Sequence, residues 1–143
     1  MATAEQFIKV KGSGVATLPP DATVLEAAQL MNERRIGSVL VVEGEKLVGI
    51  FTERDVLLRI VAAQRDPVTT RLHEVMTKKV ACAAPHTILD EIRRVMRERR
   101  IRHMPVMDGD RVTGIISIGD LNEAENARNA ETIRYLEQYI SVP

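Results

Sequence analysis

The chain reads IRHMPV at residues 101–106 and GIISIGD at 114–120. Sixty-five residues before these two stretches it reads IGSVLV at 36–41 and GIFTERD at 49–55. The offset of 65 residues is the same for both pairs of stretches. A repeat that keeps its register over so many positions predicts two copies of one structural unit.

Hydrophobic periodicity predicts the same order of elements in each copy. In the first copy we expect a short helix at 3–10, a brief strand at 15–18, a helix from Val24 to about Arg35, strands at 39–42 and 47–51, and a helix that opens at 52–55. In the second copy we expect a short helix at 72–76, a strand at 80–84, a helix from Thr87, strands at 104–107 and 112–117, and a helix at 118–126. A separate closing helix at about 130–141 would place Ile133, Leu136 and Ile140 on one face.

Capping boxes mark two of the predicted helix starts. Thr23 is followed three residues later by Glu26, and Thr87 is followed by Asp90. In such a box the hydroxyl and the carboxylate each accept a bond from an N–H group at the helix start. The second box lies 64 residues after the first, so we expect its helix to begin one residue early relative to the repeat.

The composition limits the function classes. The chain has 143 residues, 45% hydrophobic and 28% charged, with a formal net charge of zero, as expected of a globular protein rather than a disordered one. Zero net charge removes the usual electrostatic case for a membrane-surface or nucleic-acid-binding protein. The chain shows no apolar run of membrane-spanning length and no secretion signal, and it contains one cysteine, Cys82, so we expect a cytoplasmic protein.

Metal and catalytic centres are not expected. His73, His86 and His103 have no ligand-like spacing with each other or with Cys82. No pairing of a nucleophile with a base is suggested, so we do not expect a hydrolase.

The doubled β-α-β-β-α unit resembles a tandem pair of cystathionine-β-synthase-type (CBS) domains over about residues 8–125. The resemblance implies an α/β (α+β) fold in which two pseudo-twofold repeats pack as one module. We expect a first domain at 8–66, a second at 72–127 and a helical C-terminal extension at 128–143. Such pairs bind adenosyl compounds (AMP, ADP, ATP, sometimes NAD or S-adenosylmethionine) in two clefts, regulate an attached or partner protein, and commonly dimerise. The residues that carry the resemblance are the stretches 23–27, 36–42, 49–55, 75–77, 101–106 and 114–120.

Two hydroxyl-x-x-carboxylate pairs are candidate ligand contacts, namely Thr52 with Asp55 and Ser117 with Asp120. Each pair follows a glycine-led apolar strand and opens a helix, where free N–H groups and the helix dipole stabilise a phosphate. An ionised aspartate can also accept both hydroxyls of a ribose. A simple helix cap explains the same pattern, but together with the resemblance we favour nucleotide contact.

The basic pair Arg102-His103 lies where a helix passes into a strand, and charge-assisted bonds from it would stabilise a phosphate. In the first copy its positions are Gly37 and Ser38, while Arg54 stands opposite Gly119. The sequence therefore predicts two clefts of unequal strength. The arginines before the pair (Arg93, Arg94, Arg97, Arg99 and Arg100) are interpreted as surface or dimer-rim charges.

By analogy with the family, each cleft takes its adenine slot from one copy and its ribose and phosphate groups from the other. This assigns Lys11, Ala16, Ile36, Gly37, Arg102, His103, Ser117 and Asp120 to one cleft. It assigns Val80, Ile101, Thr52, Arg54 and Asp55 to the other. Ile36 and Ile101 could equally be core residues.

The favoured hypothesis is a non-catalytic sensor that binds an adenine nucleotide without a metal and controls an unidentified protein. We expect a homodimer that uses the apolar faces of the helices after Asp55 and Asp120 and the closing helix around Leu136. The alternative is a nucleic-acid-binding module that uses the arginine-rich helix 93–102. Zero net charge and only four aromatic residues disfavour this alternative, because stacking platforms are few.

Overall fold

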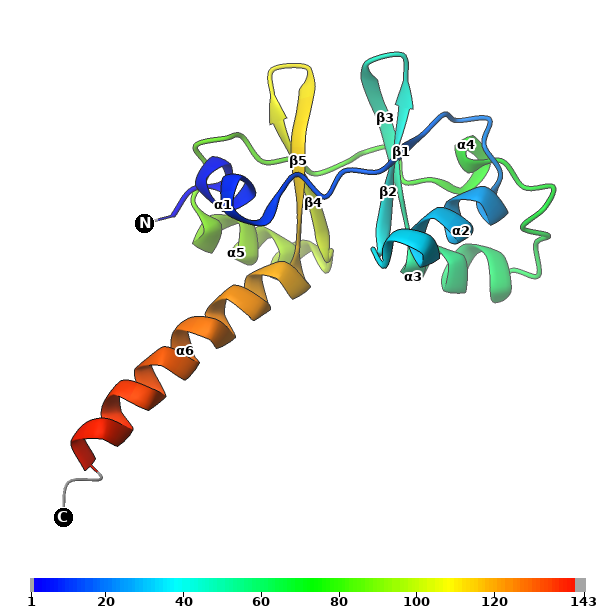
Figure 1. Ribbon diagram of the computed structural model, residues 1–143. Helices are drawn as coiled ribbons and strands as arrows, with labels where there is room; N and C mark the ends of the chain where they lie inside the picture. Colours follow the sequence, from blue (N-terminus) through cyan, green and yellow to red (C-terminus); the bar gives the residue numbers. More distant parts are fainter. Residues whose placement is uncertain (1, 141–143) are drawn as a thin grey trace.

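The computed structural model describes residues 2–140, with the side chains of residues 2–129. Two small sheets stand side by side with helices packed against them, which confirms the mixed fold of two repeats (Figure 1). None of the described helices is long and apolar enough to cross a membrane. The helices are α1 (Ala4–Lys11), α2 (Val24–Arg34), α3 (Glu53–Asp55), the π-helix η1 (Val56–Val61), α4 (Leu72–Val75), α5 (Leu89–Arg99) and α6 (Ile118–Ile140). The strands are β1 (Thr17–Leu18), β2 (Ser38–Glu43), β3 (Lys46–Thr52), β4 (His103–Asp108) and β5 (Arg111–Ser117).

The two hairpins, β2–β3 and β4–β5, are antiparallel pairs and keep the 65-residue register at both ends. Helices α2 and α5 keep it too, because they begin at Val24 and Leu89. The predicted Thr23 and Glu26 capping box is confirmed, but the predicted box at Thr87 and Asp90 is wrong. The Thr87 hydroxyl instead accepts a bond of 3.0 Å from the Ala84 N–H and closes the turn before the helix.

The predicted strand at 80–84 is also wrong, since that segment makes only an isolated parallel bridge between Ala83 and Val106. In the first half, β1 runs parallel to β2, and the Leu40 N–H donates a bond of 2.9 Å to the Ala16 carbonyl. The residue equivalent to Leu40 is Pro105, which has no N–H to donate. The second half therefore loses the bond that would lengthen its bridge into a strand.

The segment that leads into each half packs in the core of the other half. Helix α1 precedes the first half, yet Ala4 and Ile8 pack with the second-half core around Ile116. Helix α4 precedes the second half, yet Leu72 and Val75 are buried in the first-half core. Figure 1 shows α1 beside β5 and α5, and α4 beside the other hairpin. The halves are thus tied into one module by exchanged lead-in helices.

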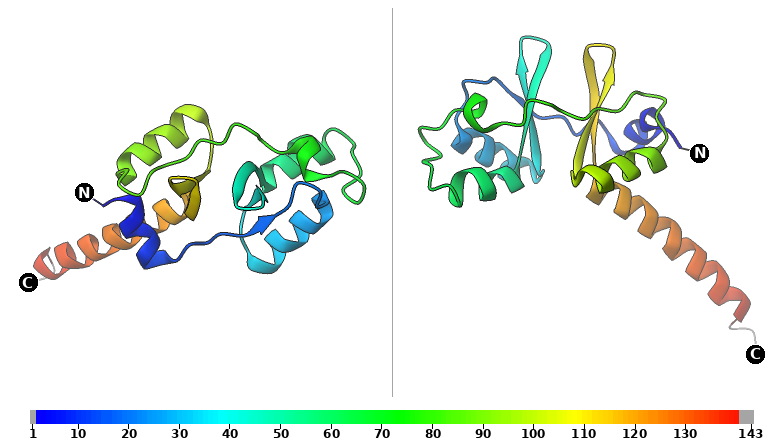
Figure 2. Two further views of the ribbon diagram at one scale, coloured as in Figure 1. Left: turned by 90° about the horizontal axis from the view of Figure 1, so that it is seen from above. Right: turned by 180° about the vertical axis from the view of Figure 1, so that it is seen from behind.

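Two glycines allow these exchanged segments to approach the hairpins. A Cβ on Gly114 would lie 2.6 Å from Ile8 Cδ1, and a Cβ on Gly49 would lie 2.5 Å from Met76 Sδ. The two connecting segments then run between the halves on opposite sides, as the view from above in Figure 2 shows. The first connection bonds to β5 through the Ser13 carbonyl, 2.9 Å from Ile115 N.

The helices that follow the two hairpins differ in form. After α3 the first half winds into the π-helix η1, where the Ala62 N–H donates to the Leu57 carbonyl. The second half continues as one helix of 23 residues, α6, which projects away from both sheets (Figures 1 and 2). The predicted C-terminal helix is present, but without the expected break between residues 126 and 130. The side chains predicted to share its face (Ile133, Leu136 and Ile140) lie outside the described side chains.

Candidate functional site

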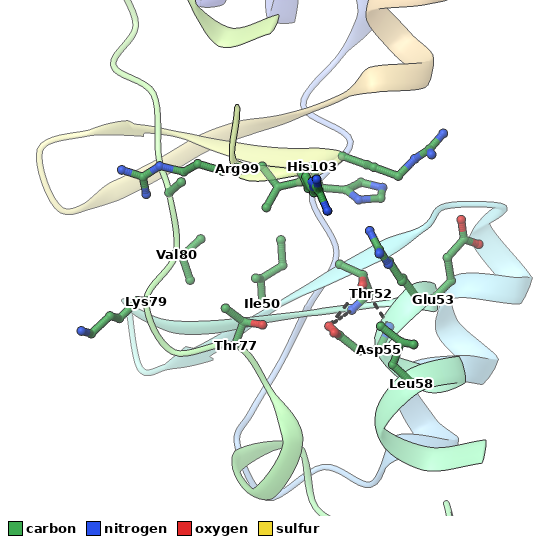
Figure 3. Close-up of a pocket in the computed structure, with 15 residues that line it drawn as sticks. Ile50, Thr52, Glu53, Asp55, Leu58, Thr77, Lys79, Val80, Arg99 and His103 are labelled. Atoms are coloured by element: carbon green, nitrogen blue, oxygen red, sulfur yellow. Dashed lines mark hydrogen bonds between the residues drawn. The ribbon is translucent and has the colours of Figure 1, made fainter. Parts of the chain in front are cut away.

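A cavity of about 400 Å³ lies between the two halves (Figure 3). One wall comes from the end of β3, from α3 and from the first turn of η1. The other wall comes from the connection before Ala83 and from the junction between α5 and β4. The lining residues are Ile50, Thr52, Glu53, Arg54, Asp55, Leu58, Thr77, Lys79, Val80, Ala81, Arg99, Arg100, Ile101, Arg102 and His103.

Thr52 and Asp55 form a reciprocal capping box on the first-half wall. Asp55 Oδ2 accepts bonds of 2.9 Å from the Thr52 N–H and 3.1 Å from its hydroxyl, while the Asp55 N–H donates to Thr52 Oγ1 at 3.3 Å. Asp55 Oδ1 lies 3.6 Å from Arg59 Nε, and the residue is only 9% exposed. The pair therefore caps the helix and lines the cavity at the same time.

Aliphatic side chains make the apolar part of the cavity. Val80 and Ile101 of the second half line it together with Ile50 and Leu58 of the first half. Figure 3 shows Val80 on the side of Ile50. Ile101 also packs against the second-half core, so the expected core role and the position in the cavity coexist. Neither a phenylalanine nor a tyrosine of the described residues lines the cavity, so a planar ligand would lie between aliphatic surfaces.

All five residues predicted for one cleft (Val80, Ile101, Thr52, Arg54 and Asp55) line this cavity. Arg102 and His103, which were assigned to the other cleft, line it as well. The reason is that Arg102 directly follows Ile101, so the whole junction between α5 and β4 faces the first half. The sequence-based assignment put Ile101 and Arg102 in different clefts, whereas both residues line this cavity.

Arg99 and Arg100 are exposed, as expected of surface charges, and they also line the cavity. Their position immediately before Ile101 was a signal that could have placed them there. Arg93 and Arg94 do lie on the surface in ion pairs, to Glu125 at 3.3 Å for Arg93 and to Glu91 and Glu98, both at 3.7 Å, for Arg94. Some arginines of this segment thus form intramolecular ion pairs, others line the cavity, and Arg97 does neither among the side chains described for residues 2–129. The lining residues that sequence reasoning missed are Ile50, Glu53, Leu58, Thr77, Lys79, Ala81, Arg99 and Arg100.

His103, at the start of β4, lies against Gly37 of the first half. Burial lowers the pKa of its imidazole, while the carboxylates of Glu53, Asp120 and Asp55 act in the opposite direction and Arg102 adds to the lowering. A Cβ on Gly37 would lie 3.0 Å from His103 Nε2 and 3.1 Å from Glu53 Oε1. The first half therefore carries a glycine at the position where the second half presents its basic pair.

The residues of the other predicted cleft are only partly brought together. Ser117 and Asp120 cap α6 reciprocally at 3.0–3.1 Å, and Lys11 Nζ lies 3.4 Å from Asp120 Oδ2. Ala16 is 3% exposed and is bonded to β2 through its carbonyl. Ile36 and Gly37 line a separate groove of about 500 Å³ against α2 and α3. Ser117 and Asp120 therefore form a helix cap whose carboxylate is ion-paired to Lys11.

The family model for the CBS domain matches residues 10–62 and 72–126. The chain is 37% identical over 107 residues to the CBS domain-containing protein YhcV of Bacillus subtilis, covering 75% of this chain and 76% of that protein. A solved protein with CBS domains from Burkholderia ambifaria MC40-6 is 40% identical, with a TM-score of 0.84 over 88% of this chain and 95% of that one. The fold is also that of the CBS domain pair of protein MJ0100, solved with 5-methylthioadenosine and S-adenosyl-L-methionine, at 24% identity and a TM-score of 0.77 over 90% of this chain and 98% of that one.

Proposed function

The chain belongs to the CBS-domain family, and from that premise we propose that it is a non-catalytic regulatory module that binds an adenine nucleotide of the AMP, ADP, ATP or NAD type. One observation carries the proposal. The cavity between the halves places the Thr52 and Asp55 pair opposite an aliphatic slot formed by Val80 and Ile101. A nucleotide needs these two environments, one polar and one apolar, within the length of a nucleoside.

In this proposal the adenine lies between Val80, Ile101 and Ile50, where burial of its faces contributes about 25 cal/mol per Å² of apolar surface. The ribose hydroxyls donate to Asp55, whose carboxylate retains acceptor capacity beyond the cap because it has about four lone-pair sites. The phosphates then extend toward the cationic side chains of the rim. The site needs no metal and no nucleophile for this role.

Regulation follows from the position of the cavity. Because its walls come from different halves, a bound nucleotide stabilises the relative placement of the halves that fits it best. A ligand shifts a conformational equilibrium only when it binds the two states with different affinity. We propose that a partner protein senses this shift.

We also propose that the chain forms a homodimer through η1. Leu57, Leu58 and Val61 are 60%, 52% and 63% exposed, which is unusual for large apolar side chains grouped on one turn. The equivalent positions on α6 are the polar residues Asn122, Glu123 and Asn126. Any apolar dimer contact from α6 would therefore have to come from other residues of that helix. Sedimentation should give a dimer at micromolar concentration and a monomer for Leu57→Glu with Val61→Glu, whereas a monomeric native chain would refute the proposal.

The decisive experiment separates a ligand contact from a helix cap. Asp55→Ala and Glu26→Ala each remove the N3 carboxylate of a capping box, and each should lower stability, Asp55→Ala more because that carboxylate is nearly buried and ion-paired to Arg59. Calorimetry with AMP, ATP and NAD should show that Asp55→Ala weakens binding at least about tenfold and that Glu26→Ala does not, because a charge-assisted bond contributes about 1.5–3 kcal/mol. Unchanged affinity in Asp55→Ala would make the residue only a cap, and a native chain that binds none of the three would end the proposal.

A further inference from the structure

The rim of the cavity carries an excess of positive charge. Five cationic side chains line it (Arg54, Lys79, Arg99, Arg100 and Arg102), against the two carboxylates of Glu53 and Asp55. Asp55 is already paired with Arg59, a residue outside the lining. No hydrogen bond or ion pair joins any of the five cationic side chains to another of the side chains described for residues 2–129. Like charges gathered in this way repel one another until an anion arrives.

This excess belongs to one location in the molecule. In the 65-residue register the residues equivalent to Arg54, Lys79 and Arg102 are Gly119, Gly14 and Gly37. Only Arg99 and Arg100 have cationic counterparts, Arg34 and Arg35. Three of the five cations are therefore specific to this cavity and are not a general property of the repeat.

From this charge balance we infer, resting on the nucleotide-binding function proposed above, that the cavity selects nucleotides with two or more phosphates over nucleoside monophosphates. A terminal phosphate carries about −1.5 to −2 charges at pH 7, and each further phosphate in a chain adds about one more. A monophosphate leaves part of the cationic rim unpaired, whereas a diphosphate or triphosphate can reach several guanidinium groups. Arginine is suited to this task because its planar donors match phosphate oxygens in pairs.

The rim positions also predict how the selectivity responds to salt. All five side chains are exposed, so their attraction for phosphate is screened as ionic strength rises. The aliphatic slot for the base is not screened. Added salt should therefore weaken ATP binding more than AMP binding.

The test is isothermal titration calorimetry of the full chain with adenosine, AMP, ADP and ATP, in buffer with EDTA and without magnesium. Affinity should rise from AMP through ADP to ATP by at least about tenfold in total, and inorganic triphosphate should compete with ATP. Arg54→Gln and Arg102→Gln should each reduce the affinity for ATP several-fold while changing that for AMP less than about twofold. Arg97→Gln is the matched control, because Arg97 is an exposed arginine that does not line the cavity.

The outcomes separate the two levels of the proposal. AMP binding as tightly as ATP, or equal losses for AMP and ATP in the two arginine variants, would overturn the inference and leave nucleotide binding in place. No binding by any member of the series would overturn both. Loss of ATP affinity in Arg97→Gln would show a general surface attraction in place of a selective rim, and that result would also overturn the inference.

Discussion

Gly37 and Ser38 lead into β2, and 65 residues later Arg102 and His103 lead into β4. The backbones at the two places are equivalent, but the side chains are not. His103 lies so close to Gly37 that a Cβ there would be 3.0 Å from its imidazole. The space between the halves thus holds the large side chain of His103 from the second half only because the first half has a glycine opposite it. A repeated fold can in this way present one polar site instead of two equal ones.

The same difference continues along the following helices. The first half exposes Leu57 and Val61 on η1, while the second half has Asn122 and Asn126 at the equivalent positions of α6. Both carboxylates are ion-paired, Asp55 to Arg59 and Asp120 to Lys11, but only Asp55 lines the cavity. The 65-residue repeat therefore sets the positions of the helices and strands. The residues that differ between the two copies give the two halves different surfaces and different parts of the cavity.

The largest expected effect tests the exchange of lead-in helices. Leu72→Ala should destabilise the chain by about 2–5 kcal/mol, because the side chain is fully buried. The loss should appear in hydrogen exchange of residues 22–61, the half that precedes Leu72 in sequence but contains its contacts. The equivalent residue, Phe7, is only partly buried in the other core, so Phe7→Ala should cost less and affect residues 83–121. Faster exchange confined to 83–121 in Leu72→Ala would contradict the exchanged packing.

The next effect compares the two carboxylates. Asp120→Ala should leave the tightest nucleotide binding within about threefold of the native value, although it removes a cap and costs about 1 kcal/mol. Asp55→Ala should cost a similar amount of stability but also most of the binding. Calorimetric stoichiometry gives the check, with one strong site expected per chain. Equal losses of affinity in the two variants would show two equivalent clefts.

A third pair of substitutions gives equal stability effects but unequal binding effects. Arg35 and Arg100 end α2 and α5 in the left-handed region, with φ of 53° and 55°. Replacing either with glycine should stabilise the chain by up to about 1 kcal/mol, because glycine adopts this conformation without steric cost. Only Arg100→Gly should weaken ATP binding, since only Arg100 lines the cavity. Urea unfolding combined with calorimetry measures both effects, and a loss of binding in Arg35→Gly would count against the assigned asymmetry.

The smallest expected effect concerns pH. Burial lowers the pKa of His103 below its unfolded value despite the facing carboxylates of Glu53, Asp55 and Asp120. Over the pH range between the two pKa values the unfolded chain binds more protons, so stability falls as pH drops below about 6.5. His103→Gln should therefore lose less melting temperature than the native chain between pH 7.5 and 5.5. Ser38, the equivalent residue in the first half, carries no such group. Parallel pH curves for variant and native chain would refute the assignment.

Much of the fold could be predicted from the repeat. The hairpins, the helices α2 and α5 and the capping box at Thr23 follow from local hydrophobic periodicity and hydroxyl-carboxylate spacing. The capping box predicted at Thr87 was wrong because its hydroxyl can accept a bond either from the helix that follows or from the turn that precedes it. The turn geometry brings the Ala84 N–H to the hydroxyl instead. The missing second strand at 80–84 was visible in principle, since Pro105 cannot donate the bond that Leu40 makes.

The sequence by itself determined that two equivalent units exist, and which residues stand at equivalent positions. It determined this because strand and helix periods are local and survive in any register-preserving repeat. Only the tertiary structure decided that Arg102 and His103 join Thr52 and Asp55, and that each lead-in helix packs on the opposite half. These are contacts between distant segments, and the way one half lies against the other sets them.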